Sequence, residues 1–191
     1  RSEKELYDSL FHYMDQNIED ESMQEIIRYY YFKLRGKSHI SEYRFNEGIG
    51  FFENDYEIRP GDLELQTLLV TTLAFTFQNS STRQIVERIN GYAEKYPGLN
   101  QNGMFINLRM RSYLSIVEEY FDFDQPDHAL GYLRLFEEIY EQNPDIDVDY
   151  NLVGDAYSAA AVFFFTNYNT DKAREYVERG LDIFPGNYEL K

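Results

Sequence analysis

Residues 148–186 read VDYNLVGDAYSAAAVFFFTNYNTDKAREYVERGLDIFPG, and this stretch decides the fold. Apolar residues recur at helical spacing over about 148–167 and again over about 171–183, which is typical of two amphipathic helices. Asn169-Thr170-Asp171 separates the two segments and Pro185-Gly186 ends the second, because such residues interrupt helices. The stretch therefore predicts a pair of helices joined by a short polar loop.

The same layout recurs toward the N-terminus. Helices are predicted over about 103–122 and 127–142, and two more lie between Asp62, a candidate N-cap, and Pro97. The helix-ending prolines Pro60, Pro97, Pro144 and Pro185 follow one another at intervals of 37, 47 and 41 residues. Self-similarity at a period of 20–50 residues indicates a helical repeat, in which neighbouring helix pairs stack to bury a continuous core.

The first 58 residues are also predicted to be helical, over about 3–18, 22–36 and 39–54. Ser22 and Glu25 have the spacing of a capping box, and Gly36 is a plausible C-cap for the same helix. No segment of the chain alternates as a strand would, so the sequence predicts an all-α protein.

The last helix pair resembles the tetratricopeptide repeat. With Gly154 as its first position, the large, small and aromatic positions of the first helix hold Tyr157, Ala161 and Phe164. The small positions of the second helix hold Ala173 and Gly180, and Pro185 closes the unit. The resemblance is partial over about 62–149 and compositional before that, so other α-solenoids remain an alternative.

This resemblance implies a right-handed α-solenoid of about four antiparallel helix pairs, at approximately 3–58, 62–97, 103–144 and 148–185. We expect residues 1–191 to form one such domain and, because the chain starts at Arg1, to be a fragment of a longer protein.

Composition excludes several classes of protein. The chain has 43% hydrophobic residues, 18 Tyr and 15 Phe, which is too apolar and aromatic for a disordered acidic segment. A net charge of −16 argues against nucleic-acid binding, which needs a positive surface. The longest apolar run, 159–165, is far shorter than the ~20 residues of a membrane span. The lack of Cys leaves cytoplasm, periplasm and cell surface open as compartments.

No enzyme motif is present, and we expect no cofactor or metal. His12, His39 and His128 fall in separate predicted helices, and no phosphate-binding loop or nucleophile elbow occurs. The run Asp145, Asp147, Asp149 imitates a calcium loop, but Tyr150 replaces the required Gly. These carboxylates more simply precede and cap the helix that follows.

Charge is concentrated in one zone. Residues 118–149 contain eleven acids and one base, Arg134, whereas residues 83–111 contain five bases and two acids. Besides promoting solubility, such an acidic zone can steer a basic partner.

In the tetratricopeptide family the first helix of each pair lines a concave groove. The resemblance therefore assigns eight residues to such a groove: Arg111, Leu114, Glu118, Phe121, Asp155, Ser158, Val162 and Phe165. An alternative is that Phe121 and Phe165 pack against further helices.

The sequence thus predicts a non-enzymatic scaffold that binds a protein or peptide, with a basic partner favoured by the acidic zone. One alternative is the peptide-sensing module of a bacterial transcriptional regulator. Another is an enzyme or ligand carrier built on α-solenoid helices. The oligomeric state is not predicted.

Overall fold

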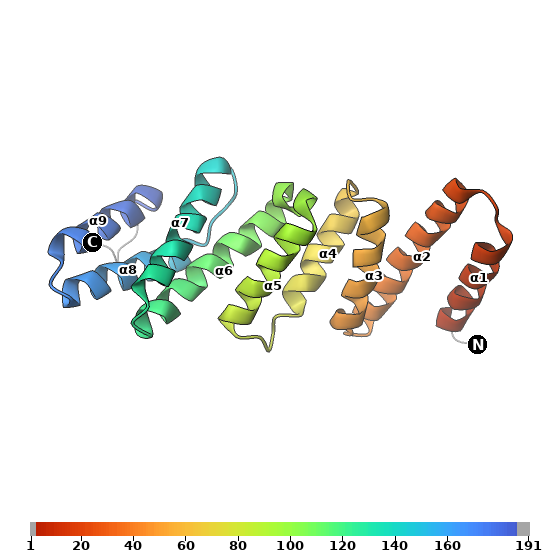
Figure 1. Cartoon of the computed structure of the whole chain (residues 1–191), viewed down its shortest axis with the longest axis horizontal. Coiled ribbons are helices and arrows are strands. Elements are labelled where there is room, and N and C mark those ends of the chain that lie inside the picture. The colour runs from red at the N-terminus through yellow and green to blue at the C-terminus, as the bar shows by residue number, and fades with distance from the viewer. Residues whose placement is uncertain (1–2, 187–191) are drawn as a thin grey trace. The chain divides into compact units, whose positions relative to one another are not determined.

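The computed structural model describes residues 3–186 of the chain. Its elements are α1 (Glu3–Asn17), α2 (Glu21–Ser41), α3 (Phe45–Ile58), α4 (Leu63–Phe75), α5 (Thr82–Lys95), the 3-10 helix η1 (Pro97–Gln101), α6 (Gly103–Asp122), α7 (Pro126–Gln142), α8 (Tyr150–Thr166) and α9 (Thr170–Ile183), as labelled in Figure 1. Residues 3–186 contain no strand, which confirms the all-α class. None of the helices in this range is long and apolar enough to cross a membrane.

The chain divides into two compact units, Arg1–Ser80 and Ser81–Lys191. The first contains α1–α4 and the second α5–α9. The division falls within the expected repeat 62–97, and the two ends of the predicted domain, 1–2 and 187–191, lie outside the described residues. The organisation of 1–191 as a single repeat domain stays a prediction.

Helix boundaries agree closely with the sequence after residue 60, because polar caps and prolines mark them. Asp62 caps α4 by accepting a hydrogen bond from the backbone N–H of Leu65 at 3.0 Å. Asp149 caps α8 in the same way through the N–H of Leu152, which confirms the capping role predicted for this carboxylate. The remaining predicted boundaries lie within about two residues of those observed, apart from the 3-10 turn after Lys95.

Two predictions about α2 are wrong. Its N-cap is Asp20, whose carboxylate accepts from the N–H of Met23 at 3.0 Å, while Ser22 donates its hydroxyl to that carboxylate. Gly36 does not end the helix, which continues to Ser41. The next helix accordingly begins at Phe45 and not at about 39.

Gly36 lies in the interior of α2, at a point where α3 approaches closely enough to exclude a side chain. A Cβ atom at this position would lie 2.5 Å from Cε1 of Phe52, a fully buried residue of α3. A Cβ on Gly48 of α3 would in turn lie 3.3 Å from the carbonyl oxygen of Gly36. Gly36, which the sequence predicted to be a C-cap, is therefore a site of close packing between α2 and α3.

In the second unit, α6 pairs with α7, α8 pairs with α9, and α6 also packs along α8. The contacts between α6 and α8, including the loop before α8, join residues about 40 positions apart. The Asn107 side chain donates to the carbonyl of Asp147 at 2.6 Å, Arg111 lies 3.4 Å from the Asp149 carboxylate, and the rings of Phe121 and Phe163 are 5.1 Å apart. This nearly constant offset means that the two helices run in the same direction, as the first helices of successive repeats do.

A buried tyrosine makes the same kind of hydrogen bond in both helix pairs. Tyr113 of α6 donates to Oδ1 of Asn90 in α5 at 2.5 Å, and Tyr157 of α8 donates to Oε1 of Glu137 in α7 at 2.6 Å. Arg179 of α9 also donates to Glu137, so one carboxylate connects three helices. Each tyrosine thereby fixes the first helix of its pair to the α-helix that precedes it in the chain. This packing is consistent with a helical repeat.

The positions that carry the family resemblance are buried in this unit. Tyr157 is fully buried, and Ala161, Phe164 and Ala173 are each 8% exposed. They belong to one apolar core that extends from Val86 of α5 to α9.

Candidate functional site

A cleft of about 430 Å³ lies along α6 and α8. Its lining residues are Glu118, Phe121, Asp122, Asp155, Ser158, Ala159, Val162, Phe163 and Thr166. Five of the eight predicted groove residues are among them: Glu118, Phe121, Asp155, Ser158 and Val162. Helical spacing puts Glu118 and Phe121 on one face of α6 and Asp155, Ser158 and Val162 on one face of α8. The packing of α6 along α8 brings the two sets together.

The cleft has an aromatic base and an exposed apolar wall. Phe121 is 7% exposed and packs against the ring of Phe163. Val162 is 60% exposed and therefore available to a ligand. The hydroxyl of Ser158 is buried and has no hydrogen-bonding partner among the described residues. The exposed apolar surface of the cleft suits the burial of a ligand's apolar side chain.

The charged side chains of the cleft all have the same sign. Glu118, Asp122 and Asp155 line it, and its lining contains no Lys, Arg or His. None of the three carboxylates forms an ion pair within residues 3–186. A basic ligand group would therefore meet carboxylates that are not already neutralised.

The structure does not bring the other three predicted residues into the cleft. Leu114 is 2% exposed and belongs to the core, one turn before Glu118. Arg111 lies two turns before Glu118 and pairs with Asp149. Phe165 is 66% exposed but lies beside the lining stripe of α8. Helical spacing placed all three on the correct helices, but the depth of packing between α6 and α8 decides which of them a ligand can reach.

Four lining residues were missed in the sequence: Asp122, Ala159, Phe163 and Thr166. Asp122, Ala159 and Thr166 each lie four residues from a predicted member of the same helix, so extending the helical spacing would have found them. Phe163 does not follow this spacing, and only the packing of α8 against α6 places it in the cleft.

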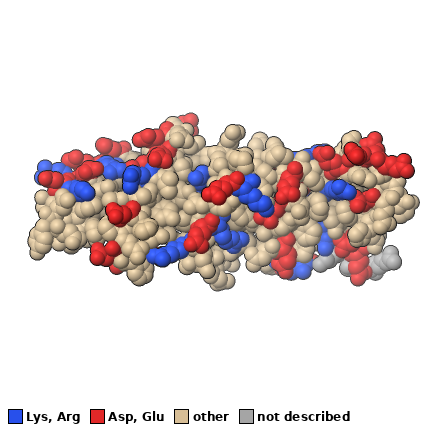
Figure 2. Space-filling model, viewed as in Figure 1, with Lys and Arg blue, Asp and Glu red and all other residues tan. Residues whose placement is uncertain are grey.

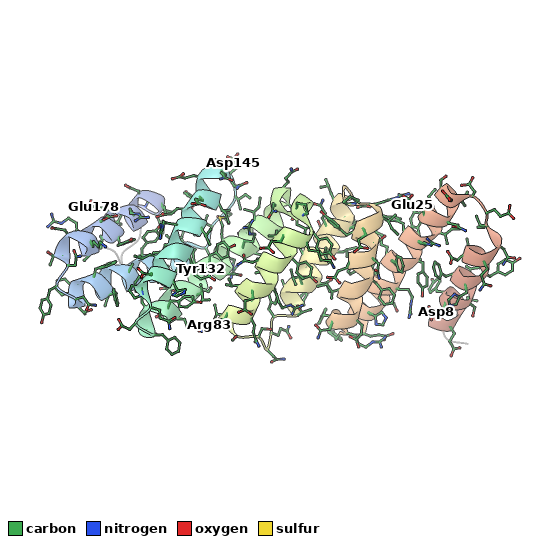
Figure 3. All side chains as sticks on the ribbon, viewed as in Figure 1. Asp8, Glu25, Arg83, Tyr132, Asp145 and Glu178 are labelled. Carbon is green, nitrogen blue, oxygen red and sulfur yellow. The ribbon has the colours of Figure 1, made fainter. Side chains whose placement is uncertain are left out.

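The acidic zone continues beyond the cleft. Figure 2 shows acidic side chains gathered at the end of α7, where Figure 3 places Asp145. Within the described residues no group of three or more His, Cys, Asp or Glu side chains is arranged to hold a metal ion.

A second cleft of the same unit, of about 490 Å³, lies on α5 and α7. Tyr132, His128 and Arg134 line it together with Asn90, Asp127, Gly131, Leu135 and Glu138. His128 is exposed, as expected for the first turn of a helix, and its ring stacks on Tyr120 at 5.2 Å between centroids. The lining mixes both signs of charge, so it favours no particular class of ligand.

Neither the protein-family models nor the curated proteins compared with this chain give a match. The fold and the α6–α8 cleft therefore carry the functional conclusion by themselves.

Proposed function

We propose that this chain is a non-enzymatic helical-repeat protein of the tetratricopeptide type, a right-handed solenoid that binds a basic peptide or protein segment in the α6–α8 cleft. The observation that carries the proposal is the composition of the cleft, in which three carboxylates without ion-pair partners surround an aromatic base. Apolar burial would supply affinity, and the carboxylates would select for Lys or Arg.

The proposal is tested with a fluorescein-labelled peptide of alternating Lys and Leu residues and a matched Glu and Leu peptide. Fluorescence anisotropy should detect binding of the basic peptide and not of the acidic one. Glu118→Lys and Asp155→Lys should each weaken binding at least tenfold, which corresponds to about 1.4 kcal/mol, because each replaces an attraction with a repulsion.

The control is Glu178→Lys, since Glu178 is an exposed acid on α9 (Figure 3) that does not line the cleft. It changes the net charge by the same amount and should leave the affinity within about twofold, a difference of ~0.4 kcal/mol. An equal loss in all three variants would show that the peptide responds only to the overall negative charge and would contradict the proposed cleft.

A further inference from the structure

A broad apolar face of α1 and α2 has no helix covering it among the described residues. Leu6, Leu10 and Tyr13 of α1 are 51–66% exposed, and Met23, Ile26, Tyr30 and Leu34 of α2 are 38–55% exposed. We call these seven residues the α1–α2 face. Between the two helices the face deepens into a groove of about 240 Å³, whose lining includes no charged residue.

The face exists because α2 is apolar on two sides. Tyr29 and Gly36 are buried on the side toward α3. Met23, Ile26, Tyr30 and Leu34 follow one another three or four residues apart and form a separate stripe. Helix α1 contacts α2 beside this stripe, where the Phe11 and Tyr31 rings stack at 3.9 Å. The stripe itself therefore stays open.

The exposed area is that of an interface. At about 200 Å² for each large apolar residue, the exposed fractions of the seven residues amount to roughly 700 Å², near the ~800 Å² that each partner buries in a standard interface. The largest apolar patch on an ordinary monomer is only about 300–600 Å². A second copy burying the same face would thus complete an interface of ordinary size.

The charges flanking the stripe match those of a second α2 in the opposite direction. Glu21 and Glu25 are exposed near the start of α2, where Figure 3 labels Glu25. Lys37 near the end of α2 pairs with Glu64 at 2.8 Å, but its side chain remains 45% exposed. In an antiparallel pair the acidic start of one helix lies beside the basic end of the other. The dipoles of two antiparallel helices also attract each other.

We propose that two copies of this chain associate through the α1–α2 face, with α2 packed antiparallel against its counterpart about a two-fold axis. The contact is isologous, so it closes at a dimer and does not propagate into fibres. The proposal is independent of the peptide-binding cleft, which lies on other helices.

Light scattering coupled to size-exclusion chromatography of the whole chain tests the association. The mass should approach twice the chain mass of 22.8 kDa at micromolar concentration. Tyr30→Glu should weaken the dimer at least tenfold, because it buries a charge at the centre of the contact. Phe165→Glu is the control, since Phe165 is also largely exposed, at 66% against 55% for Tyr30, but lies on α8. A monomeric wild type, or equal masses for the two variants, would overturn the proposal.

Cysteine cross-linking tests the orientation and does not depend on Tyr30→Glu being folded. The chain has no Cys, so one introduced thiol can form only intermolecular disulfides. An oxidised mixture of Met23→Cys and Leu34→Cys should give the mixed disulfide in excess of either symmetric one. An excess of the symmetric disulfides, or no disulfide, would contradict the antiparallel arrangement.

Discussion

Asp55 is a fully buried carboxylate in α3, and neither of its oxygens accepts a hydrogen bond from the described residues. Burial raises its pKa to about 7; Lys33 and Arg59 oppose the rise and the Asp62 carboxylate adds to it. Lys33 does not neutralise Asp55 because its ammonium is held by Glu64 at 2.7 Å and by the Tyr29 hydroxyl at 2.9 Å. Asp55 is therefore protonated in the folded protein at pH values where it is ionised in the unfolded chain.

The stability of the first unit should consequently fall as the pH rises. Between about pH 4 and pH 7 the folded state binds the Asp55 proton more tightly than the unfolded state does, so ionisation favours unfolding. A pKa difference of about 3 units amounts to ~4 kcal/mol at most. Asp55→Asn should unfold at higher urea concentration than the wild type at pH 8 and at a similar concentration at pH 4, as followed by circular dichroism.

Glu57→Gln provides the comparison, because Glu57 is an exposed acid of the same helix. It should keep the pH dependence of the wild type. The same dependence in Asp55→Asn would show that another group is responsible.

At the scale of the elements, the packing of α2 on α3 depends on two glycines that face each other. Gly36 and Gly48 let the helices approach until a side chain at either position would contact its neighbour. Gly50, two residues further along α3, faces open space, with no neighbouring atom within 4 Å of the place that a methyl group would occupy. The same residue type thus has different roles at Gly36 and Gly50, and only the position of the neighbouring helix distinguishes them.

Replacement by alanine should have opposite effects on stability at Gly36 and at Gly50. Gly36→Ala should lower the free energy of unfolding by about 1–3 kcal/mol, because the new methyl group collides with the Phe52 ring. Gly50→Ala should raise it by about 0.5–1 kcal/mol, because alanine favours the helix and meets no neighbour. Urea denaturation of both variants measures the difference. Stabilisation by both would contradict the close approach of α2 and α3.

At the scale of the whole molecule, the second unit contains a continuous core of its own. The core extends from Val86 of α5 to Tyr176 of α9 and includes the fully buried Tyr113 and Tyr157. The Tyr113–Asn90 and Tyr157–Glu137 hydrogen bonds between helices also lie within residues 81–191. The second unit therefore has the interactions that a separately folding domain needs.

The chain 81–191 should fold by itself. It should show a helical circular-dichroism spectrum and a cooperative thermal transition, because it retains the whole core. The chain 81–149, which lacks α8 and α9, should lose that cooperativity, because Phe121, whose ring packs against Phe163 of α8, and other core residues would be exposed. A non-cooperative transition for 81–191 would contradict the independence of this core.

The sequence by itself determined the all-α class and most of the helices. These features depend on the spacing of residues within one helix or on its caps, and both are local properties. The sequence did not predict the end of α2, because this boundary depends on a neighbouring helix. A glycine that ends a helix and a glycine that lets another helix approach closely cannot be distinguished until that other helix is placed.

Only the tertiary structure decided how deeply each residue is packed. Leu114 and Glu118 share a face of α6, yet one is in the core and the other lines the cleft. Asp55 resembles any acid of an amphipathic helix until α2 and α4 surround it, and the stripe of α2 resembles a core face until its neighbours prove to lie elsewhere. Burial depends on residues distant in sequence, so it follows from how the helices pack and not from the pattern of any one of them.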